Sequence, residues 1–219
     1  RLVAVGVLDA RGPAVVVRAP GRPAARVEGA RAPALDGARL AYVDDAGVRV
    51  VSWRDGVELA RVDGPLAKPA LDWPHLAYVR VGPAGQRLEI VNLLNGVRRV
   101  VTRAGRGVDL GRPAVRGGLL AWHRAAGRWS EIRVTSVARL GAGRVVATSV
   151  TGIQVNPSLA AARILWVEHA ASTSYLRLRA LGGGPVRTLA AVRGPGDILW
   201  TTALGQGRAY VTRWSPVIG

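Results

Sequence analysis

An internal repeat constrains the fold of this chain more than any other feature. The stretch APALDGARLAYV, which ends at Val43, returns as KPALDWPHLAYV, which ends at Val79. Related stretches begin at Arg112, Asn156 and Thr202. A repeat of about 40 residues is typical of proteins that build their fold by placing copies of one small unit side by side.

Each copy carries a residue that we call the anchor, near the end of its apolar stretch. The anchors are Tyr42, Tyr78, Trp122, Trp166 and Tyr210, and Val7 takes the same place in a first, divergent copy. Six anchors predict six units within a single domain that covers residues 1–219. The units correspond approximately to residues 1–29, 30–64, 65–104, 105–150, 151–192 and 193–219.

The pattern inside a unit predicts four antiparallel strands. An apolar anchor strand is followed by a turn and then by a strand that alternates, as in VRV from Val48 and LEI from Leu88. Alternation with a period of two marks a half-buried strand, so its polar members should face solvent: Arg49, Glu89, Arg133 and Arg177. A second tight turn follows in five units, at Pro20-Gly21, Asp55-Gly56, Asn95-Gly96, Ala142-Gly143 and Gly183-Gly184. Asp-Gly and Asn-Gly supply the positive backbone angles of hairpins.

Four strands in about 40 residues are the size of a propeller blade. The 28 glycines and 13 prolines leave no long window for a regular helix. We therefore predict an all-β propeller with six blades and incomplete terminal blades, or with five blades if a strand near Leu199 completes the first unit. A β-solenoid is the alternative. An incomplete blade leaves an open strand edge, which predicts further residues or a partner at that edge.

The repeat resembles the WD40-like blade of TolB-type propellers, whose pattern is approximately P-x-W-S-P-D-G-x-x-I-A-F. The second unit matches this pattern at Pro33, Asp36, Gly37, Leu40, Ala41 and Tyr42, and the third at Pro69, Leu76, Ala77 and Tyr78. The later units keep Pro113 with Leu120, Ala121 and Trp122, and Pro157 with Ile164, Leu165 and Trp166. The tryptophan of the pattern is replaced by Leu35, Leu71, Val115 and Leu159.

The resemblance implies the propeller fold and a non-enzymatic scaffold, in the periplasm or at the cell surface, that works with an envelope partner. Similar propellers also gate hydrolases of the prolyl oligopeptidase type, which is the alternative function. The chain does not begin with methionine, which also favours a removed leader and export.

The charge and the apolar pattern limit the partners. The net charge is +17, and Lys68 is the single lysine among 31 basic residues. Because the arginines are spread from Arg1 to Arg213 rather than gathered, we do not expect nucleic acid to be the partner. No apolar run has the length of a membrane span, and the absence of cysteine excludes disulfides and thiolate sites.

The sequence offers no catalytic constellation, and we predict no enzyme, no cofactor and no metal site. His75, His123 and His169 lie at non-equivalent places in different units. Glu168 and His169 would need further ligands to hold a metal. The adjacent carboxylates Asp44 and Asp45 are expected in a solvated turn, and no nucleophile elbow or phosphate-binding loop is present.

The residues just before the repeated proline are the candidate binding residues. They should lie on the innermost strand of each blade: Ala32, Lys68, Arg112, Asn156 and Thr201. Two cations beside two hydrogen-bonding side chains predict a channel end that accepts an acidic protein or peptide. The alternative interpretation is that Lys68, Arg112, Asn156 and Thr201 only solvate the channel wall.

The tryptophans divide into two groups. Trp122 and Trp166 are anchors and should pack in the core. The others lie at strand ends or turns, where they could contact a ligand: Trp53, Trp73, Trp129, Trp200 and Trp214.

Overall fold

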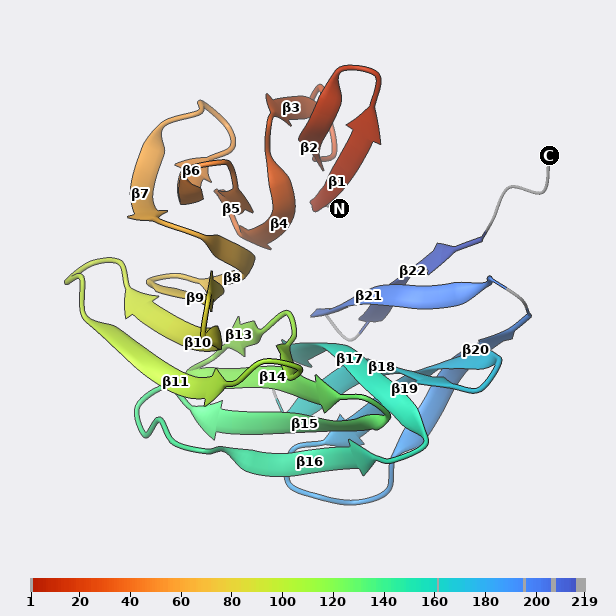
Figure 1. Ribbon diagram of the computed structural model, residues 1–219. Coiled ribbons are helices and arrows are strands. Elements are labelled where there is room, and N and C mark those ends of the chain that lie inside the picture. Colours follow the sequence, from red (N-terminus) through yellow and green to blue (C-terminus); the bar gives the residue numbers. More distant parts are fainter. Residues whose placement is uncertain (1, 161, 195, 206–207, 216–219) are drawn as a thin grey trace.

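The computed structural model describes residues 2–160, 162–194, 196–205 and 208–215, and all regular structure in these residues is β-strand (Figure 1). The strands form antiparallel sheets, and each sheet is built from one continuous segment of chain. Blade 1 has three strands, β1 (Val3–Asp9), β2 (Gly12–Arg18) and β3 (Ala25–Glu28). Blade 2 has four strands, β4 (Arg31–Asp36), β5 (Arg39–Val43), β6 (Gly47–Ser52) and β7 (Glu58–Asp63).

The next three blades follow the same order. Blade 3 consists of β8 (Leu66–Asp72), β9 (His75–Gly82), β10 (Gly85–Asn92) and β11 (Arg98–Ala104). Blade 4 consists of β12 (Asp109–Leu110), β13 (Ala114–Arg116), β14 (Leu119–Ala126), β15 (Trp129–Ser136) and β16 (Arg144–Ser149), with its inner strand divided into β12 and β13. Blade 5 consists of β17 (Gly152–Ala160), β18 (Arg163–Ala170), β19 (Thr173–Ala180) and β20 (Arg187–Arg193). The C-terminal sheet is the pair β21 (Ile198–Gly205) and β22 (Arg208–Trp214).

The sheets succeed one another around a ring, which confirms the predicted all-β propeller (Figure 1). Five of them have three or more strands, so the structure matches the five-blade alternative, and the sixth anchor lies in the two-stranded C-terminal sheet. Leu199 does not complete blade 1, because β21 pairs with β22. Within the described residues, no strand pairing joins blade 1 to the C-terminal sheet.

The core lies between the blades, where the anchors pack. Trp122 and Trp166 are 0% and 1% exposed, as their positions predict. Trp122 packs with Leu88 and Val101 of blade 3, so its ring fills the boundary between blades 3 and 4. Because each boundary buries apolar faces of two sheets, neighbouring blades stabilise one another. Tyr210, the anchor of the C-terminal sheet, is 38% exposed.

The predicted hairpin glycines have positive φ angles, for example 76° at Gly56 and 71° at Gly96.

The prediction for the alternating strands was wrong in one respect. Glu89 is 3% exposed and lies 3.3 Å from Arg80, and Arg49, Arg133 and Arg177 are only half-buried rather than solvated. Each of these side chains forms an ion pair with a charged neighbour in its own blade. The ion pair offsets the cost of removing the charge from water.

Candidate functional site

The inner strands share a local irregularity at the residue before the repeated proline. The register shifts at this place in β4, β8, β17 and β21. Ala32, Lys68 and Asn156 have left-handed φ angles of 51°, 56° and 50° there. Such angles are uncommon for residues other than glycine, and a bulge redirects a side chain out of the regular pleat. Three blades therefore present equivalent kinked residues at the inside of the ring.

Lys68 joins two blades through an ion pair. Its Nζ donates hydrogen bonds to Asp109 Oδ1 at 2.7 Å and to the carbonyl oxygen of Leu110 at 3.0 Å, both on β12 of blade 4. Gln86 Nε2 donates to the same carboxylate oxygen at 3.3 Å. The predicted cation is thus present at the inner edge of the ring, but a carboxylate of the next blade neutralises its charge.

The other carboxylate oxygen of Asp109 faces His123, which is 5% exposed. His123 Nε2 lies 3.2 Å from Asp109 Oδ2, and the backbone N–H of Asn156 donates to His123 Nδ1 at 3.3 Å. Because Nδ1 accepts, the imidazole is the tautomer whose Nε2–H donates to Asp109. The hydrogen bond from His123, supported by Lys68 and opposed by burial, holds the pKa of Asp109 well below its usual value. The cluster links blades 3, 4 and 5 at the ring centre.

Arg112 crosses the inside of the ring. Its guanidinium Nη2 donates to the carbonyl oxygen of Pro33 on β4, so it connects blade 4 to blade 2 past the intervening blade 3. No carboxylate pairs with Arg112 among the described residues. Burial lowers the pKa of Arg112 from its ordinary value. Arg112 is therefore a half-buried cation without a counter-charge among the described residues, and partial removal of a charge from water carries a cost.

The two remaining predicted residues lie at the boundary with the C-terminal sheet. Asn156 Nδ2 donates to the carbonyl oxygen of Trp200 at 2.8 Å, and the Thr202 hydroxyl donates to the Asn156 carbonyl at 2.6 Å. The Thr201 hydroxyl lies 2.9 Å from the Thr212 hydroxyl of β22 and so serves its own sheet. Lys68 contacts β12, and Arg112 lies between β12 and β13. Asn156 contacts the C-terminal sheet, whereas Thr201 contacts a strand of its own sheet.

A second charged group lies at the far ends of the inner strands. Arg116 Nη1 is 3.6 Å from Asp36 and 3.7 Å from Asp72. These three residues occupy the same repeat position in blades 4, 2 and 3, so an arginine stands where the two preceding units have aspartate. The pairing of Arg116 with both carboxylates ties three blades together at this end of the ring.

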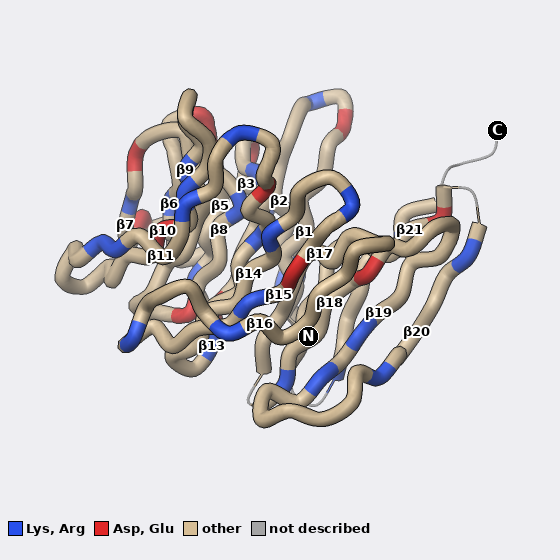
Figure 2. The backbone as a smooth tube through the Cα atoms, turned by 60° about the horizontal axis from the view of Figure 1, so that its bottom comes forward, with Lys and Arg blue, Asp and Glu red and all other residues tan. Residues whose placement is uncertain are grey.

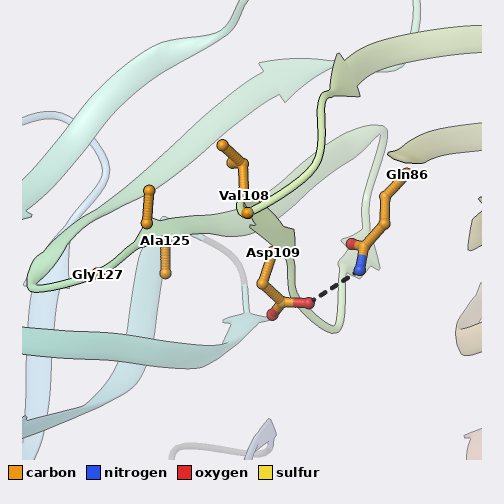
Figure 3. A pocket seen from close by; sticks show the side chains of 7 residues that line it. Gln86, Val108, Asp109, Ala125 and Gly127 are labelled. Atoms are coloured by element: carbon orange, nitrogen blue, oxygen red, sulfur yellow. Dashed lines mark hydrogen bonds between the residues drawn. The ribbon is translucent and has the colours of Figure 1, made fainter. Parts of the chain in front are cut away.

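Two open cavities flank the Lys68–Asp109 pair. One, of about 400 Å³, is lined by Gln86, Val108, Asp109 and the β14–β15 hairpin around Gly127 (Figure 3). Figure 3 shows the Asp109 carboxylate and the Gln86 amide joined by a hydrogen bond at its wall. The other, of about 450 Å³, lies between blades 2 and 3 and includes Lys68 in its lining. Both open on the ring face where the inner strands begin.

The basic residues are spread over the ring rather than gathered in one patch (Figure 2). Many arginines are paired within their own blade, as Arg177 is with Glu168 at 2.7 Å. Phosphate backbones are bound by concentrated basic surfaces. The distribution of charge therefore does not favour nucleic acid.

The other residues considered from the sequence lie apart. Among the described residues, no three His, Asp or Glu side chains gather as metal ligands would. His169 Nδ1 contacts the Ser174 hydroxyl at 2.8 Å, next to the ring of Trp200, and burial lowers the pKa of His169. Trp200 and Trp214 are 50% and 57% exposed, whereas Trp53 is 9% exposed. No helix in the described chain has the length and apolar character needed to cross a membrane.

Sequence reasoning missed Asp109 and Arg116, and it considered His123 without assigning it to a site. The repeat did contain a signal for Arg116, because RPAVR aligns with APALD and places an arginine opposite the recurring aspartate. Asp109 carried no such signal, since the inner strand of blade 4 is divided and its first part falls outside the repeated motif.

No protein-family model matches the sequence, and no curated protein matches it significantly. Solved structures with a similar fold do exist. TolB from Acinetobacter baumannii has a TM-score of 0.67 at 12% identity, over 96% of this chain and 60% of that one. A putative TolB from Agrobacterium tumefaciens has a TM-score of 0.67 at 14% identity, over 98% of this chain and 90% of that one. An acylaminoacyl peptidase from Pyrococcus horikoshii has a TM-score of 0.60 at 11% identity, over 97% of this chain and 40% of that one.

The chain thus spans 60% of the length of the Acinetobacter TolB that it matches. Identities this low are informative about the fold alone. The ring of antiparallel blades and these matches agree with the resemblance found in the repeat. The chain has the fold of a TolB-like β-propeller.

Proposed function

We propose that this protein is a non-enzymatic scaffold that binds an acidic protein or peptide partner at the centre of its ring. The observation that carries the proposal is Arg112, a half-buried guanidinium that no carboxylate neutralises among the described residues. A cation in a cleft focuses the field on an incoming anion. A carboxylate of the partner would supply the counter-charge that Arg112 lacks.

The neighbouring side chains give the site its polar lining. Lys68 and Asn156 lie on the kinked inner strands of blades 3 and 5, on either side of blade 4, and Lys68 lines the cavity of about 450 Å³. The Lys68 ammonium is already paired with Asp109, so we assign it a positioning role and assign the anion contact to Arg112. Thr201, at the boundary with the C-terminal sheet, is the most peripheral of the four proposed residues.

The test uses short labelled peptides of graded charge. Fluorescein-labelled octapeptides with zero, two or four glutamates are titrated with the protein, and anisotropy reports binding. We expect affinity to rise with the number of glutamates. Arg112→Gln should weaken the four-glutamate peptide about tenfold, because it removes a charge-assisted hydrogen bond.

Arg98→Gln is the matched control. It removes the same charge from an exposed position on β11, the outer strand of blade 3. If Arg98→Gln weakened binding as much as Arg112→Gln, the affinity would come from the overall charge of +17 and the proposal would be wrong. Binding that is independent of glutamate content would be equally contrary to it.

The proposed location is outside the cytoplasm, in the cell envelope or secreted. This follows from the resemblance to TolB-type propellers, and it is tested by fractionating the source cells and probing each fraction with an antibody to the protein. Recovery of the protein with cytoplasmic markers would contradict this part of the proposal.

A second candidate is a propeller that accompanies a hydrolase domain. The match to 40% of an acylaminoacyl peptidase chain favours it. The coding sequence on either side of this segment tests it: a G-x-S-x-G nucleophile elbow in the same reading frame would support a hydrolase accessory. Peptidase activity of that longer chain, lost on replacement of the elbow serine, would establish it.

Binding of nucleic acid is the least favoured candidate, and its salt dependence tests it. Neutralisation of several phosphates makes affinity fall steeply with salt. If an oligonucleotide bound this protein with that dependence and competed with the acidic peptide, the peptide site would have to be reassigned.

A further inference from the structure

Strand β1 of blade 1 has an open backbone edge. In blades 2, 3 and 5, the anchor strand pairs with an inner strand on one side and with a third strand on the other. Within the described residues β1 pairs with β2 alone. The loop between β1 and β2 has two residues, so Asp9 and Gly12, which flank it, form a hydrogen-bonded pair. Hydrogen-bonded and non-hydrogen-bonded pairs then alternate along the antiparallel strands. The N–H groups of Ala4, Gly6 and Leu8 therefore point away from β2, to the open edge.

The neighbouring blade lacks a packing partner at the same place. At three successive boundaries an apolar residue of one inner strand shares a core cluster with an alanine of the preceding inner strand: Leu71 with Ala34, Val115 with Ala70, and Leu159 with Ala114. These apolar residues are 5%, 6% and 5% exposed. Leu35 holds the equivalent position in blade 2, but it is only half-buried. Its cluster contains blade 1 residues such as Val15 and no alanine of a preceding inner strand.

A hydrogen-bond donor is also left over at this boundary. Asp36 Oδ2 accepts from the backbone N–H of Trp73 at 2.9 Å, and Asp72 Oδ2 accepts from the backbone N–H of Gly117 at 2.7 Å. Each aspartate thus caps the hairpin of the following blade. Gly37 occupies the same hairpin position in blade 2 and is exposed. Among the described residues, its N–H has no hydrogen-bond acceptor.

We propose that β1 binds an extended segment of a partner polypeptide, antiparallel to β1, as the inner strand of blade 1. The segment carries the pattern proline–alanine–apolar–aspartate. Its alanine lies opposite Gly6 and covers Leu35, and its aspartate accepts from the N–H of Gly37. Main-chain hydrogen bonds to the open edge supply affinity, and these two side chains supply selectivity, as in other complexes formed by strand addition. The site is separate from the Arg112 contact, so the proposal does not depend on the function proposed above.

The test uses a peptide whose sequence this protein already employs as an inner strand. The peptide LAKPALD, which is the sequence of β8, is labelled with fluorescein at its N-terminus, amidated at its C-terminus and titrated with the 219-residue chain. We expect saturable binding with one peptide per chain. Replacement of its aspartate by asparagine should weaken binding about tenfold, because the carboxylate accepts more strongly than a neutral amide.

Backbone methylation provides the matched controls. Ala70 of β8 pairs with Ala77 of β9. The N–H of Val81 in β9 donates to the Pro65 carbonyl, which precedes β8, so the N–H of Ala77, four residues earlier, also points toward β8. The N–H of the alanine before leucine therefore faces the anchor strand, and the N–H of that leucine faces away. N-methylation at this alanine should weaken binding by about tenfold or more, while N-methylation at the leucine should leave it nearly unchanged. The two peptides have the same charge, so a site that recognises charge alone would bind them equally.

A variant of the protein tests whether the peptide binds at the open edge of β1. Gly6→Pro removes an N–H that points to the open side, and an edge position tolerates proline without loss of the β1–β2 ladder. Circular dichroism checks that the sheet content is retained. We expect Gly6→Pro to abolish binding of LAKPALD. Unchanged binding to this variant would place the peptide on another edge, such as β22, and would overturn the proposal, as would equal affinity of the two methylated peptides or absence of binding.

Discussion

At the scale of single residues, this protein places charge and polarity where its repeat would allow apolar side chains. The position before the repeated proline holds Ala32 in one blade and Lys68 in the next, with similar left-handed φ angles. The kink therefore belongs to the backbone of the repeat, and the side chain at the kink is free to vary. A ring of such kinks offers a set of interchangeable side chains around one centre.

Removal of the Arg112 charge should stabilise the protein. Arg112→Met keeps much of the side-chain volume and removes a half-buried cation that no carboxylate pairs with among the described residues. We expect the cost of its partial burial to exceed the gain from its hydrogen bond to Pro33. We expect a higher Tm for Arg112→Met together with loss of acidic-peptide binding, measured by calorimetry and anisotropy. A lower Tm would indicate that Arg112 is mainly a structural tie between blades 2 and 4.

The ionisation of Tyr78 should couple to folding at high pH. Burial raises the pKa of Tyr78 to about 12, from 10.0, and its side chain is 0% exposed. The folded state holds the phenolic proton more tightly than the unfolded state does. This contribution, of about 2–3 kcal/mol, is present below pH 10 and is lost as the pH rises toward 12. Unfolding in urea at pH 9, 10, 11 and 12 measures it, and Tyr78→Phe should remove that part of the pH dependence. An identical pH profile of Tyr78→Phe and the original protein would contradict the assignment.

At the scale of the element, the blade depends on glycine where strands cross closely. Gly85 begins β10 with a φ of 125°, and a Cβ built on it would lie 2.2 Å from the carbonyl oxygen of Ala104 on the neighbouring strand. Gly85→Ala should therefore destabilise the protein by about 1–3 kcal/mol or more. Gly105→Ala is the control, since nothing lies within 4 Å of its added Cβ. Urea midpoints measure both, and equal effects of the two substitutions would refute the argument.

The strands and hairpins were largely predictable at this scale. The anchor strands, the glycine hairpins and the number of strands per unit follow from local patterns of two-residue period and turn chemistry. The exception was the environment of Glu89 and its equivalents. Alternation identifies the two faces of a strand, but it does not say how far the next blade covers each face.

At the scale of the whole molecule, stability should be graded along the ring. Blades 3 and 4 each carry a fully buried anchor, Tyr78 and Trp122, whereas the C-terminal sheet has two strands and exposes Trp200 and Trp214. A two-stranded sheet is marginally stable by itself, and local opening follows local burial. We expect amide hydrogens of β21 and β22 to exchange much faster than those of β9 and β10, measured by mass spectrometry. Equal protection of the two regions would show that the ring unfolds as one cooperative unit.

For the candidate site, the sequence predicted the positions of residues in the repeat better than their contacts. The repeat predicted Lys68 and Arg112 on inner strands; Lys68 does lie on β8, whereas Arg112 lies in the break between β12 and β13. It could not show that Lys68 is neutralised by a carboxylate 41 residues away or that Arg112 reaches Pro33 across the ring. Asp109 and His123 have no counterparts in other units, so periodicity could not point to them.

The sequence by itself determined what each unit becomes, because strand alternation, turn glycines and anchors act over a few residues. The tertiary structure decided what happens between units: five blades and a two-stranded sheet, the polar cluster at Asp109, and an open edge on β1. These outcomes depend on how sheets stack around the ring. Stacking is governed by contacts between residues dozens of positions apart, and a local pattern carries no information about the distance or direction of such contacts.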